Sequence, residues 1–137
     1  MKRYFVTGTG TNVGKTFVTC WLARAAREAG YRVFAFKPIE TGCSDVEGRL
    51  VGADQELLCK AAGDWQQKEL RGLYQFEPPV APWAAAEALG VEIDVDAILA
   101  TVARGSEGAD LVLVEGAGGW RVPITPACDM AELARRL

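Results

Sequence analysis

The amino-acid sequence predicts an α/β fold in which a parallel β-sheet is covered by helices on both faces, a three-layer αβα arrangement. A short apolar stretch, a glycine-rich loop and an amphipathic segment follow one another over residues 4–29, and a second apolar stretch covers 32–36. This order is that of a β-α-β unit, which joins parallel strands through a right-handed crossover. Residues 111–114 read LVLV, a continuous apolar run typical of a strand buried on both faces.

Length and composition limit the classes of protein to consider. The chain has 137 residues, half of them hydrophobic, so residues 1–137 can form one domain with a buried core. The net charge of −3 argues against a nucleic-acid partner, which would require a basic surface. The apolar runs are too short to cross a membrane, and the first residues enter a strand pattern directly. We therefore expect a cytoplasmic protein without a signal peptide.

The first half of the chain contains strands over 4–6 and 32–36 on either side of one helix. We expect this helix to run from Lys15 to a C-cap at Gly30. Apolar residues at helical spacing predict its buried face: Val18, Trp21, Leu22, Ala25 and Ala29. The polar segment 37–50 is expected to be a loop. A short helix over 54–62, closed by Gly63, carries apolar residues at Leu57, Leu58, Ala61 and Ala62.

The second half offers two more strands and three helices. Residues 73–76 form a candidate short strand, and the proline-rich segment 78–82 is a rigid connector to a helix over 83–89. Asp94 can cap the next helix, which turns Ile98, Leu99 and Val102 inward. A glycine-rich loop follows strand 111–114, and a last helix starts at Asp129. With four strands in hand, we expect a sheet that is incomplete on its C-terminal side and leaves an apolar flank for a partner.

Cysteine and histidine usage narrows the chemistry further. The four cysteines are widely spaced and form no CxxC pair, so we expect free thiols rather than a disulfide framework or a zinc site. The chain contains no histidine. Acid–base or electrophilic work therefore falls to Lys, Asp, Glu or Thr side chains or to backbone amides.

The segment RYFVTGTGTNVGKTF, residues 3–17, predicts a phosphate-binding P-loop, and with it a sheet of the P-loop NTPase type. In such a loop, backbone amides and the helix N-terminus hold a polyphosphate, Lys15 reaches the outer phosphates, and the Thr16 hydroxyl ligates Mg²⁺. The spacing is a variant of the common pattern, because Thr9 stands where the first glycine is expected and Gly8 lies one residue early. A glycine-rich turn with a chance GKT is the alternative, which the flanking strand and helix disfavour.

Three further residues could complete a nucleotide site. Glu115 directly follows the apolar strand, where a P-loop protein places a carboxylate for its metal ion. Asp54 could contact a metal or nucleotide, although an acid at a helix start also favours the helix dipole. Lys37 lies at the carboxyl end of the second strand, the edge at which open α/β sheets bind ligands. There it could neutralise charge on a transferred phosphoryl group, whereas its other reading is an ordinary surface lysine.

Together these residues resemble dethiobiotin synthetases, ATP-dependent cyclo-ligases of biotin biosynthesis. The matching motifs are TGTGTNVGKT (residues 7–16), KPIETG (37–42), Asp54, PPVAP (78–82) and VEGAGG (114–119), in the order and spacing of that family. The resemblance implies a homodimer that uses ATP and Mg²⁺ to convert 7,8-diaminopelargonate and CO₂ into dethiobiotin. The reaction passes through a carbamate and a carbamic-phosphoric anhydride.

The same resemblance implies a role for each matching position. Lys37 would be the catalytic lysine, assisted by Lys15. The metal would be held by Thr16, Asp54 and Glu115, and the diamine would face Thr11, Lys37 and Thr41. The nucleotide contacts would come from Asn12, Val13, Gly14, Lys15, Thr16, Phe17, Asp54, Glu115, Gly116, Ala117 and Gly118.

The chain departs from this pattern in three places. Gly10 stands where the family often has Asp, and Trp83 follows Pro82 where the family often has His. Family chains also continue beyond position 137. Three other functions share the P-loop: an ATPase switch of the partitioning type, an amidotransferase-type ligase, and a nucleotide-binding fragment without activity of its own.

Overall fold

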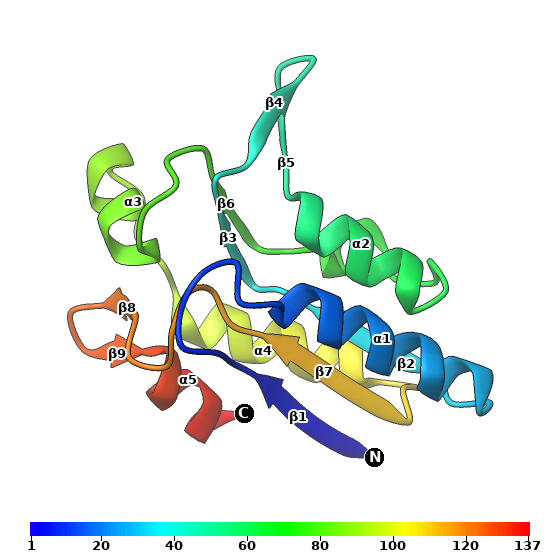
Figure 1. The fold of residues 1–137 in the computed structure, drawn as a ribbon. Coiled ribbons are helices and arrows are strands. Elements are labelled where there is room, and N and C mark those ends of the chain that lie inside the picture. The colour runs from blue at the N-terminus through cyan, green and yellow to red at the C-terminus, as the bar shows by residue number, and fades with distance from the viewer.

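The computed structural model describes residues 1–137 and has a parallel sheet of three strands at its centre (Figure 1). The strands are β1 (Lys2–Val6), β7 (Leu111–Glu115) and β2 (Val33–Phe36), in the order β1-β7-β2. Val6 pairs with Glu115 at the end of β1, so the last residue of β7 lies beside the start of the glycine-rich loop. The predicted α/β fold is therefore confirmed. Strand β7, which ends in the predicted metal-binding carboxylate Glu115, lies next to β1 as expected.

Helices cover both faces of this sheet. Helices α1 (Lys15–Glu28) and α2 (Ala53–Ala61) lie on one face, and α4 (Val95–Ser106) lies on the other (Figure 1). Helices α3 (Pro82–Leu89) and α5 (Met130–Arg136) extend the second layer beyond the strand ends. No helix is both long and apolar enough to cross a bilayer.

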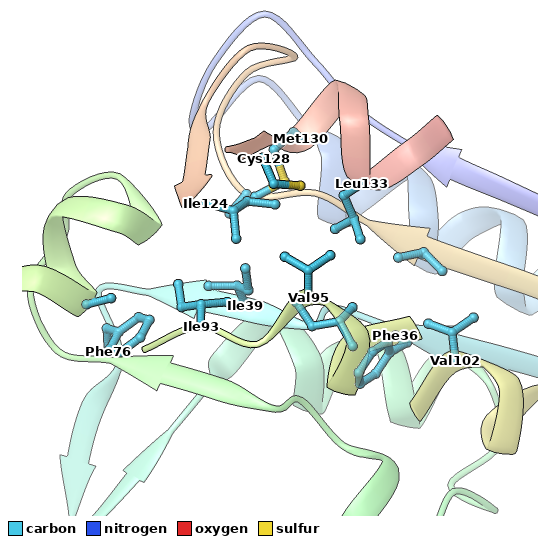
Figure 2. Packing of buried hydrophobic residues seen from close by; sticks show 14 of the residues in the cluster. Phe36, Ile39, Phe76, Ile93, Val95, Val102, Ile124, Cys128, Met130 and Leu133 are labelled. Atoms are coloured by element: carbon cyan, nitrogen blue, oxygen red, sulfur yellow. The ribbon is translucent and has the colours of Figure 1, made fainter. Parts of the chain in front are cut away.

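The alternation of side chains along β2 divides the core between these layers. Val33 and Ala35 point to α1 and α2 and belong to a smaller apolar cluster with Leu58. Phe34 and Phe36 point to the opposite face, where a larger cluster joins them to α4, α3 and α5 (Figure 2). Every residue of β2 is buried, as expected of a strand covered on both faces.

The segment between β2 and α2 differs from the sequence-based prediction. Residues 37–50 are not a plain loop, because they contain β3 (Ile39–Thr41), β4 (Ser44–Val46) and the first residues of β5 (Arg49–Val51). Strands β4 and β5 form a hairpin that projects from the body of the molecule (Figure 1). Its tip, Glu47-Gly48, has positive φ at both positions, the geometry of a tight hairpin turn.

The predicted strand over residues 73–76 does not join the central sheet. Strand β6 (Tyr74–Phe76) instead pairs in parallel with β3, in a separate ladder. Pro38, which has no N–H to donate, separates β2 from β3, and its carbonyl accepts from the N–H groups of Leu73 and Tyr74. A 3₁₀ turn (Lys68–Leu70) precedes β6, and β8 (Pro123–Thr125) pairs with β9 (Cys128–Asp129) near the end of the chain.

The predicted buried face of α1 is wrong for four of its five residues, and only Leu22 is partly buried, against the smaller core cluster. Val18 and Trp21 are exposed, as are Ala25 and Ala29, and the buried residues are Lys15, Thr19, Cys20 and Ala23. The helix is turned so that its first residue points into the site, and the small side chains Cys20 and Ala23 let it lie close to the sheet. On α2, Leu58 and Ala61 are buried as predicted, but Leu57 is exposed.

Other local predictions are confirmed. Asp94 caps α4 by accepting from the N–H groups of Asp96 and Ala97, and Ile98 and Val102 are buried beneath it. Asp129 likewise caps α5. All four cysteines are buried free thiols.

Candidate functional site

The glycine-rich loop connects β1 to α1 and leaves the helix N-terminus open. Gly14 occupies the N-cap with φ of 106°, a conformation that L side chains rarely adopt, and no side chain caps the first turn. The first backbone N–H groups of α1 are therefore free to bind an anion. Lys15 folds back over the loop, where its Nζ donates to the carbonyl of Gly10 at 2.5 Å.

Close backbone approach explains two glycines of the site. A Cβ at Gly8 would lie 2.7 Å from Val13, so a side chain there would push into the loop. A Cβ at Gly119 would lie 3.2 Å from the carbonyl oxygen of Thr9, where the loop after β7 meets the loop after β1. A Cβ at Gly10 would meet no atom within 4 Å, so packing does not require glycine at this position.

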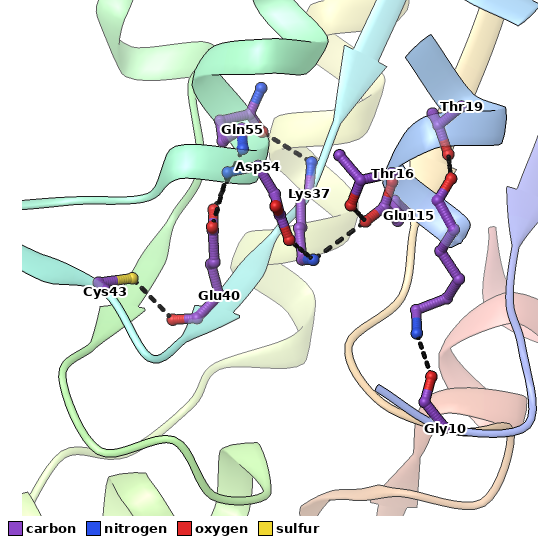
Figure 3. A network of polar contacts seen from close by, with 10 residues as sticks. Gly10, Thr16, Thr19, Lys37, Glu40, Cys43, Asp54, Gln55 and Glu115 are labelled. Atoms are coloured by element: carbon purple, nitrogen blue, oxygen red, sulfur yellow. Dashed lines mark hydrogen bonds and ion pairs between the residues drawn. The ribbon is translucent and has the colours of Figure 1, made fainter. Parts of the chain in front are cut away.

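Lys37 lies between two carboxylates at the carboxyl ends of the strands (Figure 3). Its Nζ is 2.5 Å from Asp54 Oδ2 and 3.0 Å from Glu115 Oε1. The Thr16 hydroxyl donates to the same Glu115 oxygen at 2.7 Å. Residues from α1, β7, α2 and the end of β2 thus meet at one point, so Lys37 is not the surface lysine of the alternative reading.

The two lysines respond differently to this surrounding. Burial acts to lower the pKa of Lys37, but the charges and hydrogen bonds of Glu115 and Asp54 outweigh it and raise that pKa above its ordinary value. Burial and the positive charge of Lys37 lower the pKa of Lys15. Both lysines line the cavity, where they can bind an anion, and the raised pKa keeps Lys37 protonated.

A cavity of about 450 Å³ opens beside this cluster. It brings together most of the predicted site residues, namely Thr11, Asn12, Gly14, Lys15, Thr16, Phe17, Lys37, Thr41, Asp54, Ala117 and Gly118. Glu115 lies beneath the cavity floor, bonded to Thr16 and Lys37. Val13 and Gly116 do not line it, because Val13 is exposed on the loop and Gly116 packs under Phe5.

The donor set at the base of the cavity fits a magnesium ion. Thr16, Asp54 and Glu115 offer a hydroxyl and two carboxylates, the hard oxygen ligands that Mg²⁺ uses together with phosphate and water. Glu115 Oε2 is fully buried and has no hydrogen-bond partner, so it has an unused acceptor at this point. No group of three or more His, Cys, Asp or Glu side chains gathers to hold a metal without phosphate.

Two residues of the site were missed by the sequence analysis. Glu40 lines the cavity and is buried, and its carboxylate accepts from the N–H groups of Asp54 and Gln55. Burial raises the pKa of Glu40, against the opposite effect of these two N–H groups. Gln55 is also buried and accepts from the N–H of Lys37 at 2.7 Å. Glu40 stands inside the KPIETG motif, but no spacing rule assigns it a partner 14 residues later.

A larger hollow of about 920 Å³ lies away from the loop, over β8, β9 and α5. Its charged side chains already pair with one another, Arg121 with Asp129 and Arg135 with Glu132. The cavity beside the glycine-rich loop, where cations and carboxylates converge, is therefore the stronger candidate.

Comparison with known proteins identifies the family to which this chain is similar. A family model described as an AAA domain matches residues 2–137. The ATP-dependent dethiobiotin synthetase of Nitrosospira multiformis is 41% identical over 136 residues, which cover 99% of this chain. The enzyme of the same name from Aromatoleum aromaticum is 39% identical over 136 residues, and that from Tolumonas auensis is 42% identical over 125.

The match covers only part of each relative. The chain spans 58% of the length of the Nitrosospira enzyme, 60% of the Aromatoleum enzyme and 55% of the Tolumonas enzyme. The resemblance to dethiobiotin synthetases drawn from the motifs is thus confirmed across this chain.

Proposed function

The chain belongs to the AAA domain family. From that membership and its similarity to dethiobiotin synthetases, we propose that it carries the ATP- and Mg²⁺-binding and phosphoryl-transfer site of such an enzyme. The overall reaction would join 7,8-diaminopelargonate and CO₂ at the expense of ATP. The products would be dethiobiotin, ADP and phosphate. The observation that supports this most directly is the position of Lys37, between Asp54 and Glu115 at the edge of the cavity that the glycine-rich loop borders.

The nucleotide would bind along the loop and the start of α1. Its phosphates would meet the open N–H groups from Asn12 to Phe17, with Gly116 to Gly118 closing the other side. Lys15 would turn from the Gly10 carbonyl to the outer phosphates. Thr16, Asp54 and Glu115 would hold Mg²⁺, which supplies charge neutralisation on the phosphates when bound.

The diamine would lie across the cavity, near Thr11 and Thr41. One amine takes up CO₂ as a carbamate, and a carbamate oxygen attacks the terminal phosphorus while the bond to ADP breaks. The second amine then attacks the carbamate carbon, phosphate leaves, and the ureido ring closes. Lys37 would stabilise the negative charge on the transferred group, so this chemistry requires cations and oriented amides rather than a histidine.

The test is an assay with diaminopelargonate, bicarbonate, Mg²⁺ and ATP, in which dethiobiotin and phosphate are both measured. We expect the two products in equal amounts, and no phosphate release when the diamine is left out. ATP hydrolysis that is indifferent to the diamine would instead favour a switch of the partitioning type. ATP binding without turnover would favour a nucleotide-binding fragment.

Two further expectations belong to this proposal. By resemblance, the protein would work as a homodimer in the cytoplasm. An amidotransferase-type ligase would use glutamine and a different acid substrate, so dethiobiotin formation from the diamine, bicarbonate and ATP without glutamine excludes it.

A further inference from the structure

Helix α2 starts without a capping side chain of its own. Its N-cap residue is Gly52, which has none to offer. The N–H groups of the second and third helical residues, Asp54 and Gln55, are instead bound by the carboxylate of Glu40 at 2.8 and 3.1 Å (Figure 3). These are the two N–H groups that an N-cap Ser or Asp would ordinarily satisfy.

The cap therefore comes from a different element of the structure. Glu40 belongs to β3, and only 6% of it is exposed. A Cβ at Gly52 would lie 2.3 Å from Glu40 Oε2, although φ there is −85° and suits any residue. The glycine at this position is thus required by the carboxylate that it makes room for, and not by the backbone.

A second link runs beside the first. Gln55 accepts from the N–H of Lys37 at 2.7 Å and donates to the carbonyl of Ala35 at 3.2 Å. Both members of the Lys37–Asp54 ion pair are consequently held through their backbone N–H groups, Asp54 by Glu40 and Lys37 by Gln55. The first turn of α2 cannot move from the strand ends without breaking both links.

We propose that Glu40 is a positioning residue, which ties the first turn of α2 to β3 and so holds the Asp54 carboxylate against Lys37 and above Glu115. The inference rests on the proposed function for what that carboxylate does. The tether itself rests only on the contacts of Glu40. Charge-assisted bonds to backbone N–H groups at a helix N-terminus are among the stronger hydrogen bonds, which suits a link that must fix one side chain.

The first experiment compares Glu40→Gln with Glu87→Gln, which makes the same chemical change at an exposed position on α3. A glutamine presents one acceptor oxygen and one NH₂ group, so one of the two N–H groups loses its partner. We expect amide hydrogen exchange to rise about tenfold in Glu40→Gln at whichever of Asp54 and Gln55 loses its partner, and to stay unchanged at both in Glu87→Gln. Unchanged exchange in Glu40→Gln would overturn the tether.

The second experiment separates positioning from simple helix capping. In Glu40→Ala combined with Gly52→Ser, the serine can cap α2 locally. Its Cβ no longer meets the carboxylate, and only the end of the Gln75 side chain, 3.1 Å away, has to shift. We expect the melting temperature to recover most of what Glu40→Ala alone loses. Mg²⁺ should raise ATP affinity about tenfold less than it does in the unmodified chain, and kcat should also remain about tenfold lower. ATP affinity without metal should be unchanged. Full recovery of Mg²⁺-dependent binding and kcat would reduce Glu40 to a structural cap and overturn the proposal.

The exchange and binding measurements also test the role of Glu40 separately from the proposed reaction. If the unmodified chain binds Mg²⁺-ATP but makes no dethiobiotin, the reaction proposed above fails, while the binding measurements still judge the role of Glu40. If it shows no Mg²⁺-dependent ATP binding at all, Asp54 has no metal to hold, and the positioning role is overturned together with the function. In either case, amide hydrogen exchange at Asp54 and Gln55 tests whether Glu40 ties α2 to β3.

Discussion

At the scale of single residues, the candidate site consists of charged side chains that the fold brings together from distant positions in the sequence. Lys37 contacts Asp54 and Glu115, which lie 17 and 78 positions further along the chain. Each would be costly to bury alone, and together they neutralise most of one another's charge. Two carboxylates facing one ammonium leave one negative charge unbalanced, which favours a further cation such as the proposed Mg²⁺.

Replacing Lys37 by Ala should affect turnover far more than ATP binding. The lysine is proposed to meet charge that develops during transfer, so we expect kcat to fall about 100-fold or more, with ATP affinity changed only a few-fold. Steady-state kinetics and calorimetric ATP titration measure the two effects. Lys60→Ala, at an exposed position on α2, is the matched control. Equal losses in binding and turnover would contradict the catalytic role.

Cys43 should make stability fall at alkaline pH. Burial raises the pKa of its thiol from 9.0 to about 11. Between these values the unfolded chain releases the thiol proton while the folded chain keeps it, so stability decreases as pH rises from about 9 to about 11. Urea unfolding at a series of pH values should show a flatter decline for Cys43→Ala than for the unmodified chain. An identical decline in both would contradict the shift.

At the scale of the elements, the site depends on how closely helices approach the sheet. Helix α1 approaches through Cys20 and Ala23, and its first residue is thereby directed into the cavity. Helix α4 approaches the other face through Gly105, where a Cβ would lie 2.1 Å from the ring of Phe34. Strand β2 is held between these contacts, and Lys37 follows its last residue.

Gly105→Ala should destabilise the fold, although alanine is the better helix former. The change in helix propensity would stabilise by about 1 kcal/mol, whereas forcing a methyl group against a fully buried ring costs about 1–3 kcal/mol. The ring of Phe34 is packed against Phe36 and Trp65 and has little room to move, so the packing cost lies at the upper end of that range, about 2–3 kcal/mol. After the gain of about 1 kcal/mol from helix propensity, we expect a net loss of about 1–2 kcal/mol. Denaturant unfolding measures it, and a gain in stability would show that Phe34 repacks freely.

At the scale of the whole molecule, one edge of the sheet and one helix face are unpartnered. Strand β1 pairs only with β7, and Tyr4 on it is exposed. Phe17, Val18 and Trp21 are exposed together along α1. A cluster of exposed apolar side chains and a strand edge with free N–H and C=O groups are each typical of surfaces that associate.

We therefore expect the chain to self-associate. Sedimentation equilibrium over a range of concentrations should show a dimer, in keeping with the homodimer that the family resemblance implies. Trp21→Glu places a charge in the middle of the exposed face of α1 and should shift the equilibrium toward monomer. At concentrations where both proteins are monomeric, its unfolding midpoint should match that of the unmodified chain, because Trp21 makes no part of the core. A monomer at every concentration would contradict this expectation.

Local features of this protein could be predicted from the amino-acid sequence, because each is encoded within a few neighbouring residues. The P-loop, the buried strand ending in Glu115, the cap at Asp94 and the family resemblance all follow from motifs or short periodicities. Only the tertiary structure decided which face of α1 is buried, that β6 leaves the central sheet for β3, and that Glu40 caps α2 across 14 positions. These depend on packing between elements far apart in the chain, where space and hydrogen-bonding partners override local propensity.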